Sequence, residues 1–153
     1  MRYASQTDVP SDRSRAEIER TLTRYGADAF AYGWDDQRAT LGFRIDGLRV
    51  RFELPLPDRE KFTRTPTGKK RNNARSIENA YEQGVRQRWR ALALIIKAKL
   101  EAVESGITTL PEEFLAQTVL PDGRTFGAWA IPQVKQSYIE GRMPPLLPGP
   151  SEE

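Results

Sequence analysis

The residues with the clearest chemical potential are cations gathered in the middle of the chain. Between residues 61 and 99, eleven lysines and arginines stand against two glutamates, a net charge of +9 in a chain whose total is +3. The densest part is Lys69-Lys70-Arg71, which follows Gly68 and several threonines. Cations, hydroxyls and free backbone N–H groups are the donors that bind phosphate. The cluster therefore predicts a surface for a polyanion, either nucleic acid or an acidic protein.

A second group of cations falls on one side of the helix expected after this cluster. At about 100° per residue, its members lie within an arc of about 100°. They are Arg71 (if helical), Arg75, Arg86, Arg90 and Lys97. This stripe could follow a nucleic-acid backbone. The alternative is a solvated face held by salt bridges, because Glu82 and Arg86 have the favourable i, i+4 spacing.

Arg88 and Lys99 differ from the other cations, because the same helical wheel places them among apolar residues. Two interpretations are open for each. Either the long stem lies over apolar surface with its charge in water or paired with a carboxylate, or the cation reaches a buried phosphate. Trp89 is open in the same way, since it either packs in the core or stacks on a base.

Large aromatic residues alternate with small ones along residues 29–34, which places Phe30, Tyr32 and Trp34 on one face of a strand. Beside strands that carry Arg44, Arg49 and Arg51, they have the composition of a platform for single-stranded nucleic acid. The alternative is a sheet face packed on a helix. Together these patterns predict a nucleic-acid-binding set of Lys61, Arg64, Lys69, Lys70, Arg71, Arg75, Arg86, Arg88 and Arg90, with Tyr32, Trp34 and Trp89 as stacking candidates.

The absence of both cysteine and histidine removes most catalytic designs. Ser-His-Asp and Cys-His catalysis, zinc fingers, His-ligated metals and disulfides are all excluded. The carboxylate pairs Asp35-Asp36 and Glu112-Glu113 are adjacent in sequence, so they diverge on a strand or helix. No Walker loop is present. We therefore predict no catalytic residue, no metal site and no cofactor, which disfavours an enzyme.

Alternating apolar residues predict three consecutive β-strands. They cover residues 29–34, 40–45 and 48–54. Asp46-Gly47 separates the second from the third and is a strong hairpin signal, because both central residues of a type I′ turn need positive φ. The pattern predicts an antiparallel three-stranded meander.

One helix is expected before these strands in the chain and another after them. Ser14-x-x-Glu17 has the spacing of a capping box and predicts a helix over about 15–25. Residues 55–73 have three prolines and no apolar periodicity, which indicates a long loop. Apolar residues at three- and four-residue spacing over 74–104 predict a long central helix. The fold class is thus α+β, with the meander packed on this helix.

Shorter helices are expected near the C-terminal end. One starts at Thr109, and a final one covers about 125–140 with Trp129, Val134 and Tyr138 packing inward. Together these elements predict one domain over 14–142, between a flexible segment 1–13 and a flexible proline-rich tail 143–153.

The chain shows neither a membrane-spanning apolar run nor the apolar core of a secretory signal. We therefore expect a soluble protein of the cytoplasm. Its oligomeric state is left open by the sequence.

Four runs of the sequence resemble small hypothetical proteins of tailed bacteriophages and prophages. They are RYGADAFAYGW (24–34), FTRTPTG (62–68), RQRWRALALIIKAKLEAVESGI (86–107) and LPDG (120–123). The resemblance extends from about Ala16 to Pro144. It implies a phage gene product in the cytoplasm of a host cell and carries over no activity and no catalytic residue.

Three functional hypotheses follow from the charge pattern and the resemblance. The first is a phage accessory protein that binds nucleic acid, with single-stranded DNA or a recombination or replication intermediate favoured. The second is a phage inhibitor of a host protein or an anti-phage defence complex, in which the basic region docks on an acidic protein surface. The third is a binder of a phosphorylated small molecule, or an enzyme built on Arg, Lys, Tyr and Glu; no constellation in the sequence brings a nucleophile and a base together.

Overall fold

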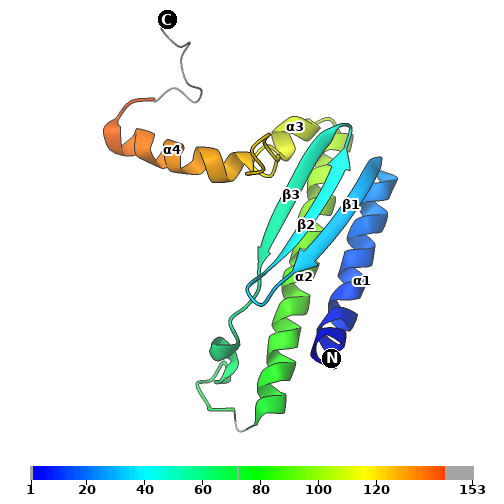
Figure 1. Ribbon diagram of the computed structural model, residues 1–153, viewed down its shortest axis with the longest axis vertical. Helices are drawn as coiled ribbons and strands as arrows, with labels where there is room; N and C mark the ends of the chain where they lie inside the picture. The colour runs from blue at the N-terminus through cyan, green and yellow to red at the C-terminus, as the bar shows by residue number, and fades with distance from the viewer. Residues whose placement is uncertain (1, 72, 144–153) are drawn as a thin grey trace, which may run out of the picture.

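The computed structural model describes residues 2–71 and 73–143, with side chains from residue 12 onward. Its elements follow one another as helix, three strands and four further helical segments (Figure 1). In chain order they are α1 (Arg2–Arg24), β1 (Ala27–Trp34), β2 (Arg38–Ile45), β3 (Leu48–Pro55), the 3₁₀ helix η1 (Arg59–Phe62), α2 (Ala74–Glu104), α3 (Leu110–Glu113) and α4 (Phe126–Glu140).

The three strands form the predicted antiparallel meander, in the order β1-β2-β3. The turn between β2 and β3 has φ of 50° at Asp46 and 76° at Gly47. These are the two positive φ values that the Asp-Gly pair predicted. The turn sets the register in which Ile45 faces Leu48 and Phe43 faces Val50.

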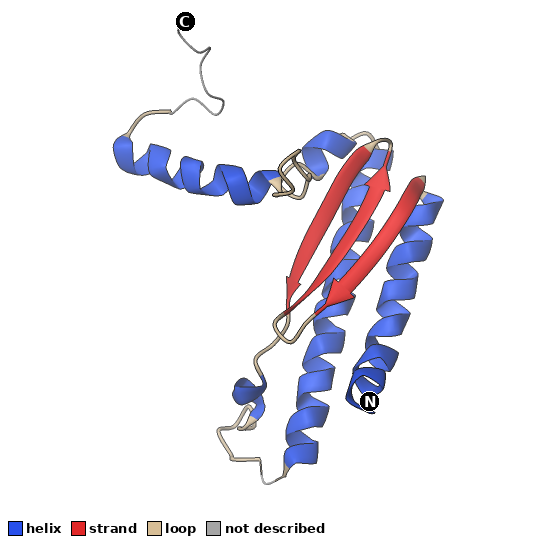
Figure 2. Cartoon of the chain, viewed as in Figure 1, coloured by secondary structure: helices blue, strands red, loops and turns tan. Residues whose placement is uncertain are grey.

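One face of the sheet packs on α1 and α2, and the opposite face carries no helix (Figure 2). The sheet contributes buried residues from β2 and β3, among them Leu41, Phe43, Val50 and Phe52. Phe114 is completely buried and meets the rings of Phe43 and Phe52 edge-on. The α+β class and the packing on a long central helix are therefore confirmed.

The long helix α2 is the centre of the core. Asn73 caps its N-terminus by accepting a hydrogen bond from the Ser76 N–H. Six buried residues recur at the predicted three- and four-residue spacing: Tyr81, Val85, Trp89, Leu92, Ile96 and Leu100. The chain leaves the helix at Gly106, whose φ is 78°.

The first helix is longer than the sequence pattern indicated. α1 begins at Arg2, so residues 2–13 belong to the same helix as residues 14–24. Ser14 consequently lies inside the helix and not at its cap. The part after it packs as expected, because Ile18 and Leu22 are each about 1% exposed.

The last helix projects away from the rest of the molecule (Figure 1). Backbone hydrogen bonds from Phe126 to Thr118 and from Gly127 to Ala116 hold its first turn. Val134 is 47% and Tyr138 84% exposed, so the prediction that they pack inward was wrong. The hydrophobic period of α4 was read correctly as helical, but the side chains expected to pack inward lie on an exposed face. The predicted tail beyond residue 143 lies outside the described residues.

Candidate nucleic-acid interface

The segment expected to be a long loop before α2 is folded by its own hydrogen bonds. Asp58 accepts from the Glu60 N–H and starts η1. A small hairpin follows, in which the Thr65 N–H donates to the Lys69 carbonyl at 2.7 Å and the Arg71 N–H to the Thr63 carbonyl at 2.8 Å. Such turn and hairpin bonds leave no apolar periodicity in the sequence. Its cations are therefore held in defined positions.

Gly84 lets this segment lie directly against α2. A Cβ at position 84 would come within 2.9 Å of the Phe62 ring and 3.2 Å of Pro57. The Phe62 ring also meets the Tyr81 ring edge-on, with centroids 6.3 Å apart. Arg59 also contacts Tyr81, since its guanidinium lies 4.1 Å from the centre of the Tyr81 ring. The same guanidinium forms an ion pair with Glu78. Glycine inside a helix lowers helix stability by about 1 kcal/mol, and here it makes close packing possible.

A basic groove lies between this segment and α2. Its volume is about 610 Å³. Four cations line it, namely Lys61, Arg64, Arg71 and Arg88. Its remaining lining residues are apolar or neutral polar side chains and include no carboxylate. All four cations belong to the set predicted from the sequence.

The three arginines of the basic groove are held by carbonyl oxygens. Arg71 Nε donates to the Phe62 carbonyl at 2.7 Å, Arg64 to the Gly68 carbonyl at 3.2 Å, and Arg88 to the Pro55 carbonyl at 3.1 Å. The Lys61 side chain is exposed and makes no hydrogen bond or ion pair with the described residues. Because a carbonyl oxygen orients a guanidinium without cancelling its charge, the groove keeps its positive potential.

The other predicted cations do not line the basic groove. Lys69 and Lys70 are exposed on the second arm of the small hairpin, where Lys70 pairs with Arg64 of the groove. Arg75, Arg86 and Arg90 are exposed on another arc of α2, whose centre lies roughly 120° around the helix from the groove. Among the described residues, Glu82 and Arg86 form no ion pair, so this face is solvated but lacks the salt bridge that their spacing allowed.

Of the two interpretations left open for Lys99 and Trp89, the structure shows pairing with a carboxylate for Lys99 and packing in the core for Trp89. Lys99 Nζ donates to the carboxylate and to the backbone carbonyl of Glu113, both at 3.1 Å. Trp89 is only 4% exposed and belongs to the core. Neither side chain is available for nucleic acid in this fold.

The aromatic residues and the arginines of the expected platform lie on opposite faces of the sheet. Phe30 pairs with Phe43 and Tyr32 with Leu41, so the aromatic residues point to the helix side. Arg44, by contrast, pairs with Ala29 on the outward side. Tyr32 and Trp34 remain 43% and 45% exposed at the edge of the sheet, and the Arg15 guanidinium lies 3.9 Å from the Tyr32 ring centre. The aromatic side chains therefore point to the opposite face of the sheet from Arg44, Arg49 and Arg51.

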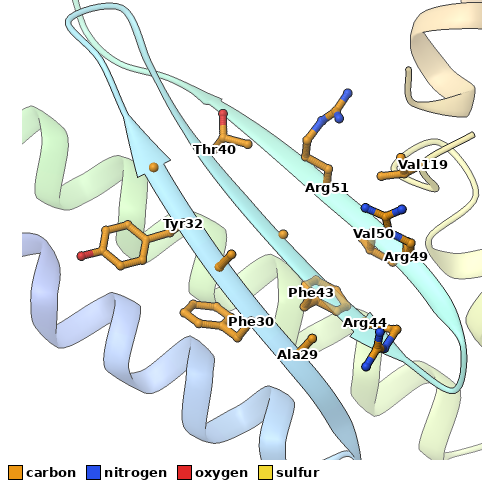
Figure 3. Close-up of a pocket in the computed structure, with 13 residues that line it drawn as sticks. Ala29, Phe30, Tyr32, Thr40, Phe43, Arg44, Arg49, Val50, Arg51 and Val119 are labelled. Atoms are coloured by element: carbon orange, nitrogen blue, oxygen red, sulfur yellow. The ribbon is translucent and has the colours of Figure 1, made fainter. Parts of the chain in front are cut away.

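The outward face of the sheet carries these three arginines over a floor of small residues (Figure 3). Arg44 donates two hydrogen bonds to Asp28, at 2.8 and 3.1 Å. This pairing lowers the pKa of Asp28 below its usual range and raises that of Arg44. The alternation of small residues along 29–33 was visible in the sequence, but which face would stay uncovered was not.

The described residues contain no group of three or more acidic side chains placed to hold a metal ion. Among the same residues, no helix has the length and apolarity needed to cross a membrane. Comparisons of the chain with protein-family models, with curated proteins and with solved structures found no match.

Proposed function

We propose that this protein binds nucleic acid, with single-stranded DNA favoured, by placing the sugar-phosphate backbone in the basic groove. The observation that carries the proposal is the convergence of Lys61, Arg64, Arg71 and Arg88 on one groove without a lining carboxylate. Phosphate contacts supply most of the affinity for nucleic acid, and they require cations whose charge is not already neutralised.

The surface beside the groove favours an extended ligand rather than a single phosphate. Lys69 and Lys70 continue the positive charge along the hairpin, and the neutral polar side chains Gln83 and Gln87 line the helix side of the groove. An extended chain of phosphates can contact several such positions in succession. The function in a phage-infected cell, as an accessory to replication or recombination, is part of the same proposal and rests on the sequence resemblance.

The test is a salt titration with a labelled single-stranded oligonucleotide, measured by fluorescence anisotropy. Removal of two groove cations in a Lys61→Gln/Arg64→Gln variant should reduce the dependence of log K on log salt by about 1.4, at about 0.7 per lost phosphate contact. The matched control is Arg20→Gln/Lys135→Gln, which removes the same charge from exposed positions on α1 and α4.

Equal losses in the two variants would show attraction to net charge and would overturn a specific groove. Duplex DNA and RNA of the same length are measured in parallel. If none of the three nucleic acids binds the wild-type protein at low salt, the proposal is wrong. Retention of a host protein from nuclease-treated lysate would then favour the acidic protein partner.

A further inference from the structure

The outward face of the sheet forms a second depression, of about 500 Å³. Its floor consists of small residues from two strands, namely Ala29, Ala31, Gly33 and Gly42. Arg44, Arg49 and Arg51 stand around this floor, and Val119 lies beside β3 (Figure 3). We call this depression the sheet-face pocket. It lies on the opposite side of the sheet from the helices and is separate from the basic groove.

The two glycines of the floor are not required by the fold. A Cβ at Gly33 would meet no atom within 4 Å, and one at Gly42 would make only ordinary contact, 3.6 Å from the Val50 carbonyl. Neither glycine has a φ in the left-handed region. Glycine weakens a strand interior, and in that position it often marks a site where a ligand approaches the backbone closely.

The arginines of the sheet-face pocket have hydrogen-bonding capacity to spare. Arg49 stands directly opposite Arg44 in the register, and like charges in that position are destabilising. Arg51 Nε is buried without a hydrogen-bond acceptor, because Glu53 lies 3.8 Å away. The Arg49 side chain makes no hydrogen bond or ion pair among the described residues.

The charge and the shape of the pocket point to a small ligand. Asp28 and Glu53 offset two of the three arginines, which leaves enough charge for one phosphate group and too little for a polyanion. The floor carries no side chain larger than a methyl group, so it accommodates a flat ring. The segment around Val119 closes one side, since the Val119 N–H donates to the Arg49 carbonyl at 2.8 Å and the Arg51 N–H to Gln117 at 2.9 Å. The volume falls within the usual range for small-molecule sites, roughly 300–1,000 Å³.

We propose that the sheet-face pocket binds a free nucleoside monophosphate. The base lies flat on the glycine and alanine floor, and the phosphate accepts hydrogen bonds from Arg49 and Arg51. Arginine suits this role because its planar fork binds a phosphate through two parallel hydrogen bonds. The site is independent of the basic groove and of the function proposed for it.

The test is calorimetric titration with each of the four ribonucleoside 5′-monophosphates, with adenosine and inorganic phosphate as partial ligands. A Gly42→Val variant fills the floor with a residue that favours strands, so it should lower nucleotide affinity about tenfold or more while leaving Tm unchanged or higher. Arg49→Gln should weaken nucleotide binding but leave binding of adenosine unchanged. The control variant is Lys135→Gln on α4, which should bind as the wild type does.

Three results would overturn the site. They are no binding of any monophosphate to the wild type, full binding by Gly42→Val, or loss of nucleotide binding in Lys61→Gln/Arg64→Gln, which would place the nucleotide in the basic groove. If Gly42→Val lowers the affinity for an oligonucleotide as strongly as the affinity for the monophosphate, the ligand of this pocket is a nucleotide within a nucleic-acid strand and the proposal of a free nucleotide is wrong. Failure here leaves the salt titration of the basic groove unaffected.

Discussion

The basic groove and the sheet-face pocket both present arginines, but they balance the charge differently. In the groove, Arg64, Arg71 and Arg88 are held by carbonyl oxygens. On the sheet, Arg44 and Arg51 face the carboxylates of Asp28 and Glu53. A carbonyl positions a cation and leaves its charge available, whereas a carboxylate neutralises it.

This difference predicts two kinds of recognition. Binding in the groove should depend steeply on salt and little on the shape of the ligand, because uncompensated cations attract any chain of phosphates. Binding on the sheet should depend on shape, because the bare floor and the spare hydrogen-bond donors of Arg49 and Arg51 select a small flat ligand. Three variants test the difference in packing and charge balance between the two regions.

The largest effect is expected from Gly84→Leu. Its side chain would displace Phe62 and Pro57 from α2 and disperse the groove cations without removing any charge. We expect oligonucleotide affinity to fall further than in Lys61→Gln/Arg64→Gln, and nucleotide binding on the sheet to stay unchanged. Faster amide hydrogen exchange over residues 57–71 would report the displacement. The control is Ala98→Leu at an exposed position of α2; unchanged oligonucleotide binding in Gly84→Leu would show that charge alone suffices.

An intermediate effect is expected from Arg71→Lys. The substitution keeps the positive charge but removes the guanidinium hydrogen bond to the Phe62 carbonyl. A hydrogen bond from a charged group contributes about 1.5–3 kcal/mol, so the segment 57–71 should loosen against α2. Oligonucleotide affinity should fall several-fold in anisotropy measurements, with a smaller change in salt slope than Arg71→Gln produces. Identical behaviour of the two variants would mean that Arg71 acts only through its charge.

The smallest effect is expected from Asp28→Asn on the sheet. Arg44 lowers the folded-state pKa of Asp28 below its unfolded value, so the pair stabilises the fold above the unfolded pKa. That stabilisation is lost as the pH falls through the folded pKa. The variant should therefore have a slightly lower Tm than the wild type at pH 7, and the two should converge in acid. A Tm difference that persists at pH 2 would contradict this origin.

The elements of this fold could be predicted largely from local patterns. Asp46-Gly47 set the hairpin turn, alternation set the strands, and the spacing of Tyr81, Val85 and Trp89 set the buried face of α2. Each of these depends on residues close together in the chain, so propensity and periodicity suffice. The predictions for α1 and α4 were less accurate, because the capping-box pattern at Ser14 did not mark the start of α1 and the partner of the apolar face of α4 depends on tertiary contacts.

The sequence by itself determined the α+β class, the order of the elements and the concentration of positive charge between residues 61 and 99. Only the tertiary structure decided which cations meet. The docking of Phe62 over Gly84 separates Arg64 and Arg71 from the stripe of Arg86 and Arg90, and the strand register places the aromatics and the sheet arginines on opposite faces. The physical reason is that a chemical surface is made by residues distant in the chain, whose relative positions follow from packing and not from their spacing in sequence.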